Sequence, residues 1–515
     1  MPKNVLGREI PASIDGLGEL KPFQGPFSLQ PGGRKAGAKL GMIRPGQKKV
    51  VESIEKAILE AGLQDGMTIS FHHHFREGDY IVNMVMDVIA KLGIKDLVLA
   101  PSSLTTVHEP LIKHIEKGVI RRIETSGLRG PLAEAISRGL MDIPVIIRSH
   151  GGRARAIETG ELSIDVAFLG VPCCDQYGNA NGFSGKSICG SLGYAMVDAR
   201  YADKVVLITD NLVDYPNLPA SIPQTDVDLI VQVEAIGDPR GIMSGATRYT
   251  TNPRELLIAR YAAEVIEASG YFEDGFSLQS GSGGASLAVA RFLREKMLEK
   301  NITASFALGG ITQQFVEMHE EGLIKKLFDT QSFDLVAAQS IGKNPLHYEI
   351  DTSFYANPHN KGCAANMLDV VILSALEIDT NFHVNVITGS DGVIRGASGG
   401  HSDTAACAKM AVVVAPLIRG RIPTVLERVH NVITPGETVD VLVTDRGIAV
   451  NPLRQDLEER FRKAKLPLLS IEELKAKGEK LTGKPEPIAF NDKIVGIIEY
   501  RDGTVIDVIR QVAEV

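Results

Sequence analysis

FSLQSGSGGASLAVA, residues 276–290, sets a short β-capable run directly against a glycine loop and a helical pattern. Gly281, Gly283 and Gly284 let backbone N–H groups approach a ligand closely, and the helix start adds partial positive charge. The segment is therefore predicted to be a strand, loop and helix junction that can hold an anion or an oxyanion. The alternative is that these glycines serve only a tight turn.

Composition limits the class of protein. The chain has 515 residues, too many for one core, with 44% hydrophobic and 23% charged residues and a net charge of −8. This predicts two or three globular domains and argues against binding to nucleic acid or to an anionic membrane surface. No apolar run reaches 18 residues and no signal peptide is evident, so we expect a cytoplasmic protein. The five cysteines lack a CxxC pair and are expected to be reduced thiols.

The order of patterns along the chain predicts the domain organisation. Residues 1–46 are rich in Gly and Pro without a sustained period, which is typical of an extended arm. From residue 47 onward, helical and β patterns alternate, as in parallel α/β sheets. A Gly-rich, polar segment near residues 237–251 divides this region. We therefore predict one α/β domain over 47–240 and a second over 241–515.

Two segments have similar patterns. IDVAFLGVPCCDQYGNAN (164–181) and LDVVILSALEIDTNFHVN (368–385) each contain an apolar strand, and their Asp and Asn residues fall at equal offsets. This similarity favours two domains built on one plan. In the same register, Glu377 takes the place of Cys173. The carboxylate could act chemically, or it could accept backbone hydrogen bonds in a structural role.

Arginines cluster in an otherwise acidic chain. Seven of them lie between residues 121 and 155, against three acidic residues. Arg129 and Arg153 lie in glycine loops, which at strand ends are where open parallel sheets bind ligands. A guanidinium there can bind a carboxylate through two hydrogen bonds. Solvated helix faces fit the arginines at 121, 122, 138 and 155 better.

Three consecutive histidines, residues 72–74, end the first predicted strand. In extended geometry, His72 and His74 share one face and His73 points to the other, so the three cannot converge on one ion. We expect no metal site here. A further glycine cluster, GSDGVIRGASGGHSD (389–403), places Arg395 and His401 beside Gly399 and Gly400.

Taken together, these segments resemble the citrate lyase alpha-subunit family, from about Lys48 onward. The segments that carry the resemblance are SFHHHFREGDYIVNMVMDVIAKLG, TSGLRGPLAEAISRGL, SHGGRARAIETGELSIDVAFLGVPCCDQYGNANG, TTNPRELLIARYAAEVIEASGYF, SALEIDTNFHVNVITGSDGVIRGASGGHSDTA and APLIRGRIPTVLERV.

The resemblance implies a fold, an activity and partners. It implies two tandem CoA-transferase-like α/β domains, with mainly parallel sheets flanked by helices. The implied activity exchanges acetate for citrate on an acyl carrier, giving citryl-carrier and acetate. The partners would be a lyase β subunit and a γ acyl carrier subunit, in a complex that we expect to contain several copies of this chain. No cofactor is expected to be tightly bound, since the carrier brings a CoA-like phosphoribosyl-dephospho-CoA group, for which acetyl-CoA could substitute.

Related CoA-transferases often use a glutamate nucleophile. When the second half is aligned with them, that position falls at Gly309–Gly310, where there is no carboxylate. We therefore expect direct transfer through a citric acetic anhydride, without a covalent enzyme intermediate. Amides of Ser282, Gly283 and Gly284 are predicted to stabilise the oxyanions. Glu377 is the alternative nucleophile to test.

The remaining candidates are assigned by charge. Substrate carboxylates are expected to bind Arg76, Arg129, Arg153 and His401, and the carrier's prosthetic arm to pass Arg395, Gly399 and Gly400. Two other functions stay open: a citramalate lyase alpha subunit or free-standing acetyl-CoA-dependent transferase, and a non-catalytic scaffold that docks the carrier and the lyase.

Overall fold

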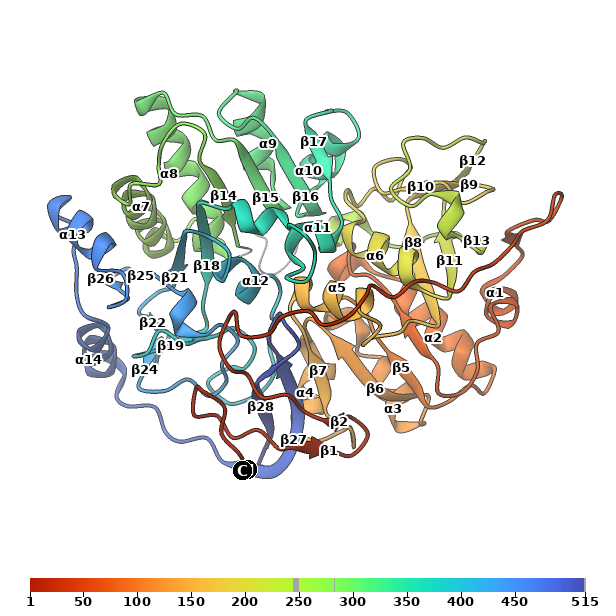
Figure 1. The fold of residues 1–515 in the computed structure, drawn as a ribbon, viewed down its shortest axis with the longest axis horizontal. Coiled ribbons are helices and arrows are strands. Elements are labelled where there is room, and N and C mark those ends of the chain that lie inside the picture. Colours follow the sequence, from red (N-terminus) through yellow and green to blue (C-terminus); the bar gives the residue numbers. More distant parts are fainter. Residues whose placement is uncertain (244–249, 282, 514–515) are drawn as a thin grey trace.

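The computed structural model describes residues 1–243, 250–281 and 283–513 and consists of two α/β halves side by side (Figure 1). The first half, residues 47–243 together with 490–512, is built on a ten-stranded sheet. In spatial order its strands are β28 (Val505–Val512), β27 (Phe490–Glu499), β7 (Val145–Ile147), β6 (Ile120–Thr125), β5 (Leu97–Leu99), β4 (Thr68–Ser70), β8 (Val166–Val171), β11 (Lys204–Thr209), β13 (Leu229–Gln232) and β3 (Val50–Val51). All neighbouring strands are parallel except β27 and β28. The helices are α1 (Ile54–Ala61), α2 (Ile81–Lys91), α3 (Leu111–Glu116), α4 (Gly130–Ser137), α5 (His150–Glu158) and α6 (Gly193–Tyr201).

The second half, residues 250–489, repeats this plan on an eight-stranded sheet. Its strands in spatial order are β17 (His347–Glu349), β16 (Leu327–Ser332), β15 (Phe306–Ile311), β14 (Ser277–Ser280), β18 (Val370–Ser374), β21 (Met410–Val414), β25 (Val441–Thr444) and β26 (Gly447–Val450). Its helices are α7 (Pro253–Ala268), α8 (Gly284–Lys300), α9 (Gln313–Glu320), α10 (Leu335–Ile341), α11 (Thr352–Ala356), α12 (His401–Ala405), α13 (Gln455–Lys463) and α14 (Ile471–Thr482). The predicted α/β class with mainly parallel sheets is confirmed.

The internal repeat read from the sequence is present in three dimensions. After β8, the strands β9 (Cys173–Asp175) and β10 (Ala180–Asn181) form a small sheet with β12 (Leu212–Val213). After β18, the strands β19 (Glu377–Asp379) and β20 (Val384–Asn385) form the same sheet with β24 (Val425–Leu426). Asn181 pairs with Cys173, and Asn385 pairs with Glu377. Cys173 and Glu377 therefore hold equivalent positions in the two halves.

Local sequence signals explain several helix boundaries. Asn252 caps α7 by accepting the Arg254 N–H, and Pro253 occupies the first turn. Gly62 ends α1 with φ 73°, a conformation that costs glycine little. The strand, loop and helix predicted for 276–290 are β14 and α8, whose Ala288, Val289 and Leu293 are buried against the sheet.

The C-terminal hairpin corrects the predicted domain boundaries. Strands β27 and β28 lie in the 241–515 region assigned to the second domain, yet β27 pairs in parallel with β7 of the first half. Ile497 and Ile498 pair with Ile146 and Ile147, which covers an apolar strand that would otherwise be a sheet edge. Local patterns could predict the two strands but not the distant strand that they join.

The N-terminal arm lies on this hairpin before it crosses the face of the molecule (Figure 1). Besides the short pair β1 (Ser13–Ile14) and β2 (Gly18–Glu19), it adds Phe23, whose N–H donates to the Val505 carbonyl at 2.9 Å. Ile10 packs with Ile497 and Val508.

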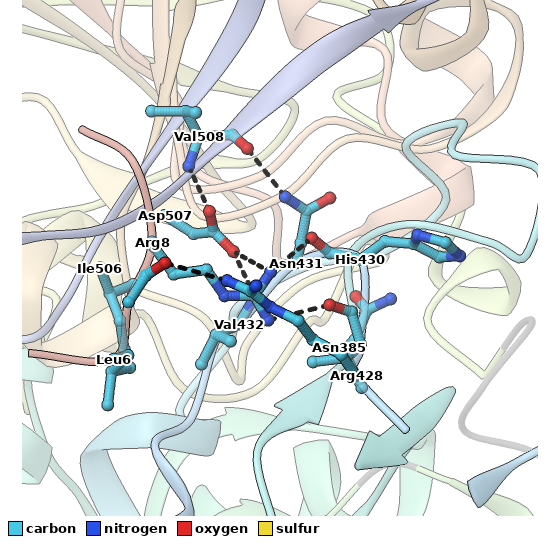
Figure 2. A network of polar contacts seen from close by, with 12 residues as sticks. Leu6, Arg8, Asn385, Arg428, His430, Asn431, Val432, Ile506, Asp507 and Val508 are labelled. Atoms are coloured by element: carbon cyan, nitrogen blue, oxygen red, sulfur yellow. Dashed lines mark hydrogen bonds and ion pairs between the residues drawn. The ribbon is translucent and has the colours of Figure 1, made fainter. Parts of the chain in front are cut away.

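Arg8 connects the arm to both halves (Figure 2). Its guanidinium donates to the Val429 and His430 carbonyls at 2.8 and 3.1 Å and lies 3.5 Å from the Asp507 carboxylate. Asp507 in turn accepts the Val432 N–H at 2.9 Å. The N-terminal arm, the C-terminal hairpin and the 428–434 loop of the second half therefore form one buried junction.

Candidate functional site

A cavity of about 420 Å³ lies between the two halves, at the carboxyl ends of their parallel strands. The first half contributes His73, Arg76, Glu77, Ser103, Thr105, Arg129, His150 and Tyr194 to its lining. The second half contributes Gln279, Ser280, Gly281, Gly283, Gly309, Gly310, Thr330, Gln331, Phe333, Tyr355, 373–376, Val386, 395–401 and Arg419. Strand ends of this kind are where α/β sheets bind ligands.

Two glycine loops that the sequence marked separately pair with each other across this interface. The Leu128 N–H donates to the Gly396 carbonyl at 3.1 Å, and the Ser398 N–H donates to the Ser126 carbonyl at 2.8 Å. Gly127 pairs with Ala397, and a Cβ on Gly127 would lie 2.2 Å from the Ala397 Cβ. Glycine is therefore required at Gly127 because the two backbones approach so closely.

Asp403 strengthens the same interface between the two halves. Its carboxylate accepts the Ser149 hydroxyl at 2.8 Å and the Gly151 N–H at 2.9 Å, both at the start of α5 in the first half. Burial raises the pKa of Asp403 to about 6 despite these bonds and the nearby Arg501. The cavity wall is therefore held from both halves by hydrogen bonds.

Arg76 and Arg129 supply positive charge to the cavity. The Arg76 guanidinium lies 4.5 Å from the centre of the Phe333 ring, and no ion pair ties either arginine to an acid within the described residues. Burial and the neighbouring Arg129 lower the pKa of Arg76 to about 10. Glu77 is the one carboxylate among the described lining residues. Two half-buried, weakly compensated guanidinium groups are suited to binding a polyanion.

Arg153 does not line the cavity. It is buried and its guanidinium bonds both oxygens of Asp198, at 2.7 and 2.8 Å, and the Ala100 carbonyl at 2.8 Å. Because both terminal nitrogens of Arg153 bond to Asp198, the guanidinium has no free fork for a substrate carboxylate. The predicted substrate contact at Arg153 is replaced by a structural ion pair that orients α5 against α6.

His401 reaches the cavity but uses both ring nitrogens. Nδ1 bonds the Thr434 hydroxyl at 2.7 Å and Nε2 bonds the Ser374 carbonyl at 2.9 Å. Burial lowers the pKa of His401 to about 4, so the ring is neutral. A neutral ring with both nitrogens engaged holds the end of β18 in place and is a poor partner for a carboxylate.

The glycine loop after β14 faces the cavity, as the 276–290 pattern predicted. Gly281 and Gly283 line it, whereas Gly284 begins α8 and is not among the lining residues. Ser282 lies outside the described residues. A Cβ on Gly283 would lie 2.0 Å from the Ser374 Oγ. The amide-based oxyanion site therefore stays a prediction, with Gly283 the described residue best placed for it.

Glu377 lies behind the cavity. It is 3% exposed, accepts the Asn385 side-chain N–H at 2.9 Å and is absent from the lining, although its neighbour Leu376 is present. Burial raises its pKa. These contacts favour the structural reading of Glu377 over the nucleophilic one. Gly309 and Gly310 do line the cavity, so at this position the wall carries no carboxylate.

The candidates for the carrier arm lie at one side of the cavity. Gly399 has φ 56°, and Gly400 leaves no room for a Cβ, which would lie 2.3 Å from the Tyr355 hydroxyl. Arg395 is exposed and its guanidinium pairs with Asp391. All three residues line the cavity, and Arg395 would have to exchange Asp391 for a ligand phosphate in order to bind one.

Sequence reasoning missed several lining residues. Tyr194 lies outside the quoted motifs, His150 lies in the quoted segment SHGGRAR but was not selected, and His73 was treated only as a strand-end residue. Arg419 lies in the quoted segment APLIRGRIPTVLERV, but its donors are used by the Ala375 and Leu376 carbonyls, the latter at 2.5 Å. The run of three histidines was the available signal for His73.

The described residues contain neither a metal-binding cluster nor a membrane-spanning helix. In residues 1–243, 250–281 and 283–513, no three His, Cys, Asp or Glu side chains are grouped so that they could hold a metal ion. Over the same ranges, no helix combines the length and apolar character needed to span a bilayer.

Comparison with known proteins decides the family. The model of the family "Citrate lyase, alpha subunit" matches residues 47–512. The chain belongs to the citrate lyase alpha-subunit family. The citrate lyase alpha chain of Klebsiella pneumoniae is 64% identical over 466 residues, covering 90% of this chain and 92% of that protein. The Escherichia coli citrate lyase alpha chain is 61% identical over 467 residues, covering 91% of this chain and 92% of that protein.

Solved structures agree with this family assignment. The alpha subunit of citrate lyase from Streptococcus mutans, solved in complex with citrate, is 59% identical, with a TM-score of 0.96 over 99% of this chain and 100% of that one. A Pseudomonas malonate decarboxylase chain shares the fold at 17% identity, with a TM-score of 0.63 over 86% of this chain and 95% of that one. The family resemblance predicted from the sequence is confirmed.

Proposed function

We propose that this chain transfers the thiol of an acyl carrier from acetate to citrate, within a citrate lyase complex that also contains a lyase subunit and a carrier subunit. One observation supports this most strongly. The cavity between the halves places Arg76 and Arg129, without acidic partners among the described residues, beside glycine-rich strand ends. Such a site suits a tricarboxylate and a thioester.

The proposed reaction balances without a protein nucleophile. A citrate carboxylate oxygen attacks the acetyl carbonyl carbon and the C–S bond breaks. This step forms a citric acetic anhydride and releases the carrier thiolate. The thiolate then attacks the citryl carbonyl carbon, the bridging C–O bond breaks, and acetate departs with the bridging oxygen. No net proton transfer is needed. The cavity must only orient the reactants and stabilise two successive oxyanions.

The described residues support distinct tasks in this scheme. Arg76 and Arg129 hold the carboxylates that do not react, because each offers a planar fork. The Gly283 amide region, at the N-terminal end of α8, is the proposed oxyanion site. The lack of a carboxylate at Gly309–Gly310 and the buried position of Glu377 support direct transfer. Glu77 is the remaining lining carboxylate, so it must be tested alongside Glu377.

The proposed function is tested by exchange with the purified chain. Acetyl-carrier and citrate should yield citryl-carrier and acetate without the lyase subunit, and a chain with both Arg76→Ala and Arg129→Ala should be at least about 100-fold slower. Citramalate in place of citrate tests the related lyase, and acetyl-CoA in place of acetyl-carrier tests a free-standing transferase. Failure of exchange by a folded, carrier-binding chain would favour the scaffold.

A further inference from the structure

Three uncharged hydrogen-bonding side chains converge on one wall of the cavity, all from the first half. The rings of His73 and His150 have centroids 6.0 Å apart, and each lies 4.8 Å from the ring of Tyr194. All three line the cavity. His73, His150 and Tyr194 are called the donor cluster below. None of the three takes part in the carboxylate binding proposed for Arg76 and Arg129.

The hydrogen bonds of His73 favour one position for the ring proton. The Ser102 hydroxyl accepts the His73 backbone N–H at 3.0 Å and lies 2.6 Å from Nδ1. Both groups are satisfied when the hydroxyl donates its own proton to Nδ1. The ring proton then sits on Nε2. His73 therefore presents an N–H donor rather than a lone pair.

The surroundings keep the cluster neutral. Burial, with His150, Arg76 and Arg129 nearby, lowers the pKa of His73 well below its usual value. Burial and the cations Arg76, Arg153 and Arg129 lower the pKa of His150 to about 3. Burial raises the pKa of Tyr194 well above its usual value. The wall therefore offers neutral donors next to two fixed positive charges.

A neutral donor cluster and a cationic pair suit different parts of one ligand. Carboxylates gain most from the guanidinium groups, whereas an imidazole N–H and a phenol suit an uncharged oxygen that both accepts and donates. We infer that His73, His150 and Tyr194 form a subsite for the tertiary hydroxyl of the tricarboxylate, and so select a 2-hydroxy acid over its deoxy analogue. This inference rests on the proposed function and specifies its substrate.

The fold supports a fixed subsite. His74, next to His73 in the chain, packs its ring 5.5 Å from Tyr194 and 4.2 Å from His72. The His150 backbone N–H donates to the Gly399 carbonyl at 2.8 Å, which ties the start of α5 to the second half. A site held this rigidly leaves its polar groups unpaired when a ligand lacks the hydroxyl, which is what produces strong rejection.

The test compares citrate with tricarballylate, which has a hydrogen in place of the hydroxyl, as acceptors of the carrier thiol from acetyl-carrier. The wild-type chain should prefer citrate by at least about 100-fold in kcat/KM. Tyr194→Phe, which removes one oxygen, and His73→Phe should each reduce this ratio at least about 10-fold. His73→Gln, which retains an N–H donor, should restore part of it. Arg129→Ala is the matched control and should leave the ratio nearly unchanged while it slows both acids.

The outcomes separate the two proposals. A wild-type chain that uses citrate and tricarballylate equally would overturn the hydroxyl subsite and leave the proposed function intact. An unchanged ratio in folded Tyr194→Phe and His73→Phe would also overturn it. A wild-type chain that binds carrier but uses neither acid would overturn the proposed function itself. Circular dichroism of each variant shows whether it is folded.

Discussion

The backbone N–H of Leu128 donates to the carbonyl oxygen of Gly396 at 3.1 Å, and this bond joins loops that lie in different halves of the molecule. Both loops are glycine-rich, and neither forms the cavity wall without the other. The cavity wall exists because the loops pair like two short strands. Changes at the pairing should therefore affect the site without touching any proposed ligand contact.

Gly127 tests this pairing. Gly127→Ala should lower exchange activity at least about 10-fold and reduce thermal stability, because the new Cβ would overlap Ala397. The matched control is Gly362→Ala, where no atom lies within 4 Å of the new Cβ. Equal activity of both variants would mean that the loops can separate at no cost to the site.

Arg129 and Arg153 should behave in opposite ways. Arg129→Ala should raise KM for citrate about 10- to 100-fold while thermal stability holds, since the guanidinium has no acidic partner among the described residues. Arg153→Ala should instead destabilise the fold by about 3–5 kcal/mol, because Asp198 would stay buried and unpaired. Steady-state kinetics and thermal melting separate the two effects. A pure KM effect at Arg153 would restore its substrate role.

Arg8 tests the junction of the arm, the hairpin and the second half (Figure 2). Arg8→Ala should lower the thermal midpoint, because Asp507 and two backbone carbonyls lose their donor inside the junction. Lys3→Ala, at an exposed position of the same arm, should leave the thermal midpoint unchanged. Proteolysis of the C-terminal hairpin offers a second measurement, and an unaltered cleavage rate would contradict the coupling.

His401 predicts a pH effect with a definite sign. Its folded-state pKa of about 4 lies below the usual value of about 6.5, so between these pH values the unfolded chain binds more protons. The wild type should therefore lose about 1.4 kcal/mol per pH unit relative to His401→Asn as the pH falls from 6.5 to 4. The thermal midpoint of His401→Asn should therefore lie below that of the wild type by an amount that shrinks as the pH falls. A constant deficit would mean that the ring is protonated in the fold.

Local patterns predicted much of the fold, for reasons visible in particular residues. Asp165 and Asp369 each accept the first backbone N–H of a neighbouring strand, from Thr68 and Ser277, so the repeated sequence reports a repeated contact. The loop at Gly281 and Gly283 follows from glycine and strand spacing alone. Pairing between distant segments is different, since nothing near Ile497 specifies Ile146 as its neighbour.

The same distinction holds for the site. Arg129 could be selected by residue type and loop position and Arg76 by its charge, and both line the cavity. Arg153 met the same criteria as Arg129, but its partner Asp198 lies on α6, and no sequence spacing indicates that pairing. Residue type identifies groups able to bind a carboxylate, whereas the tertiary partner determines whether they are free to do so.

Oxygen transfer tests the central claim most directly. A single turnover with enzyme in excess over acetyl-carrier, started with citrate labelled with ¹⁸O in its carboxylates, is followed by mass spectrometry of the released acetate. Direct anhydride exchange predicts one ¹⁸O in acetate in that first turnover, because the bridging oxygen comes from citrate. Unlabelled acetate, with ¹⁸O recovered on Glu77 or Glu377, would contradict direct transfer and show a glutamyl intermediate.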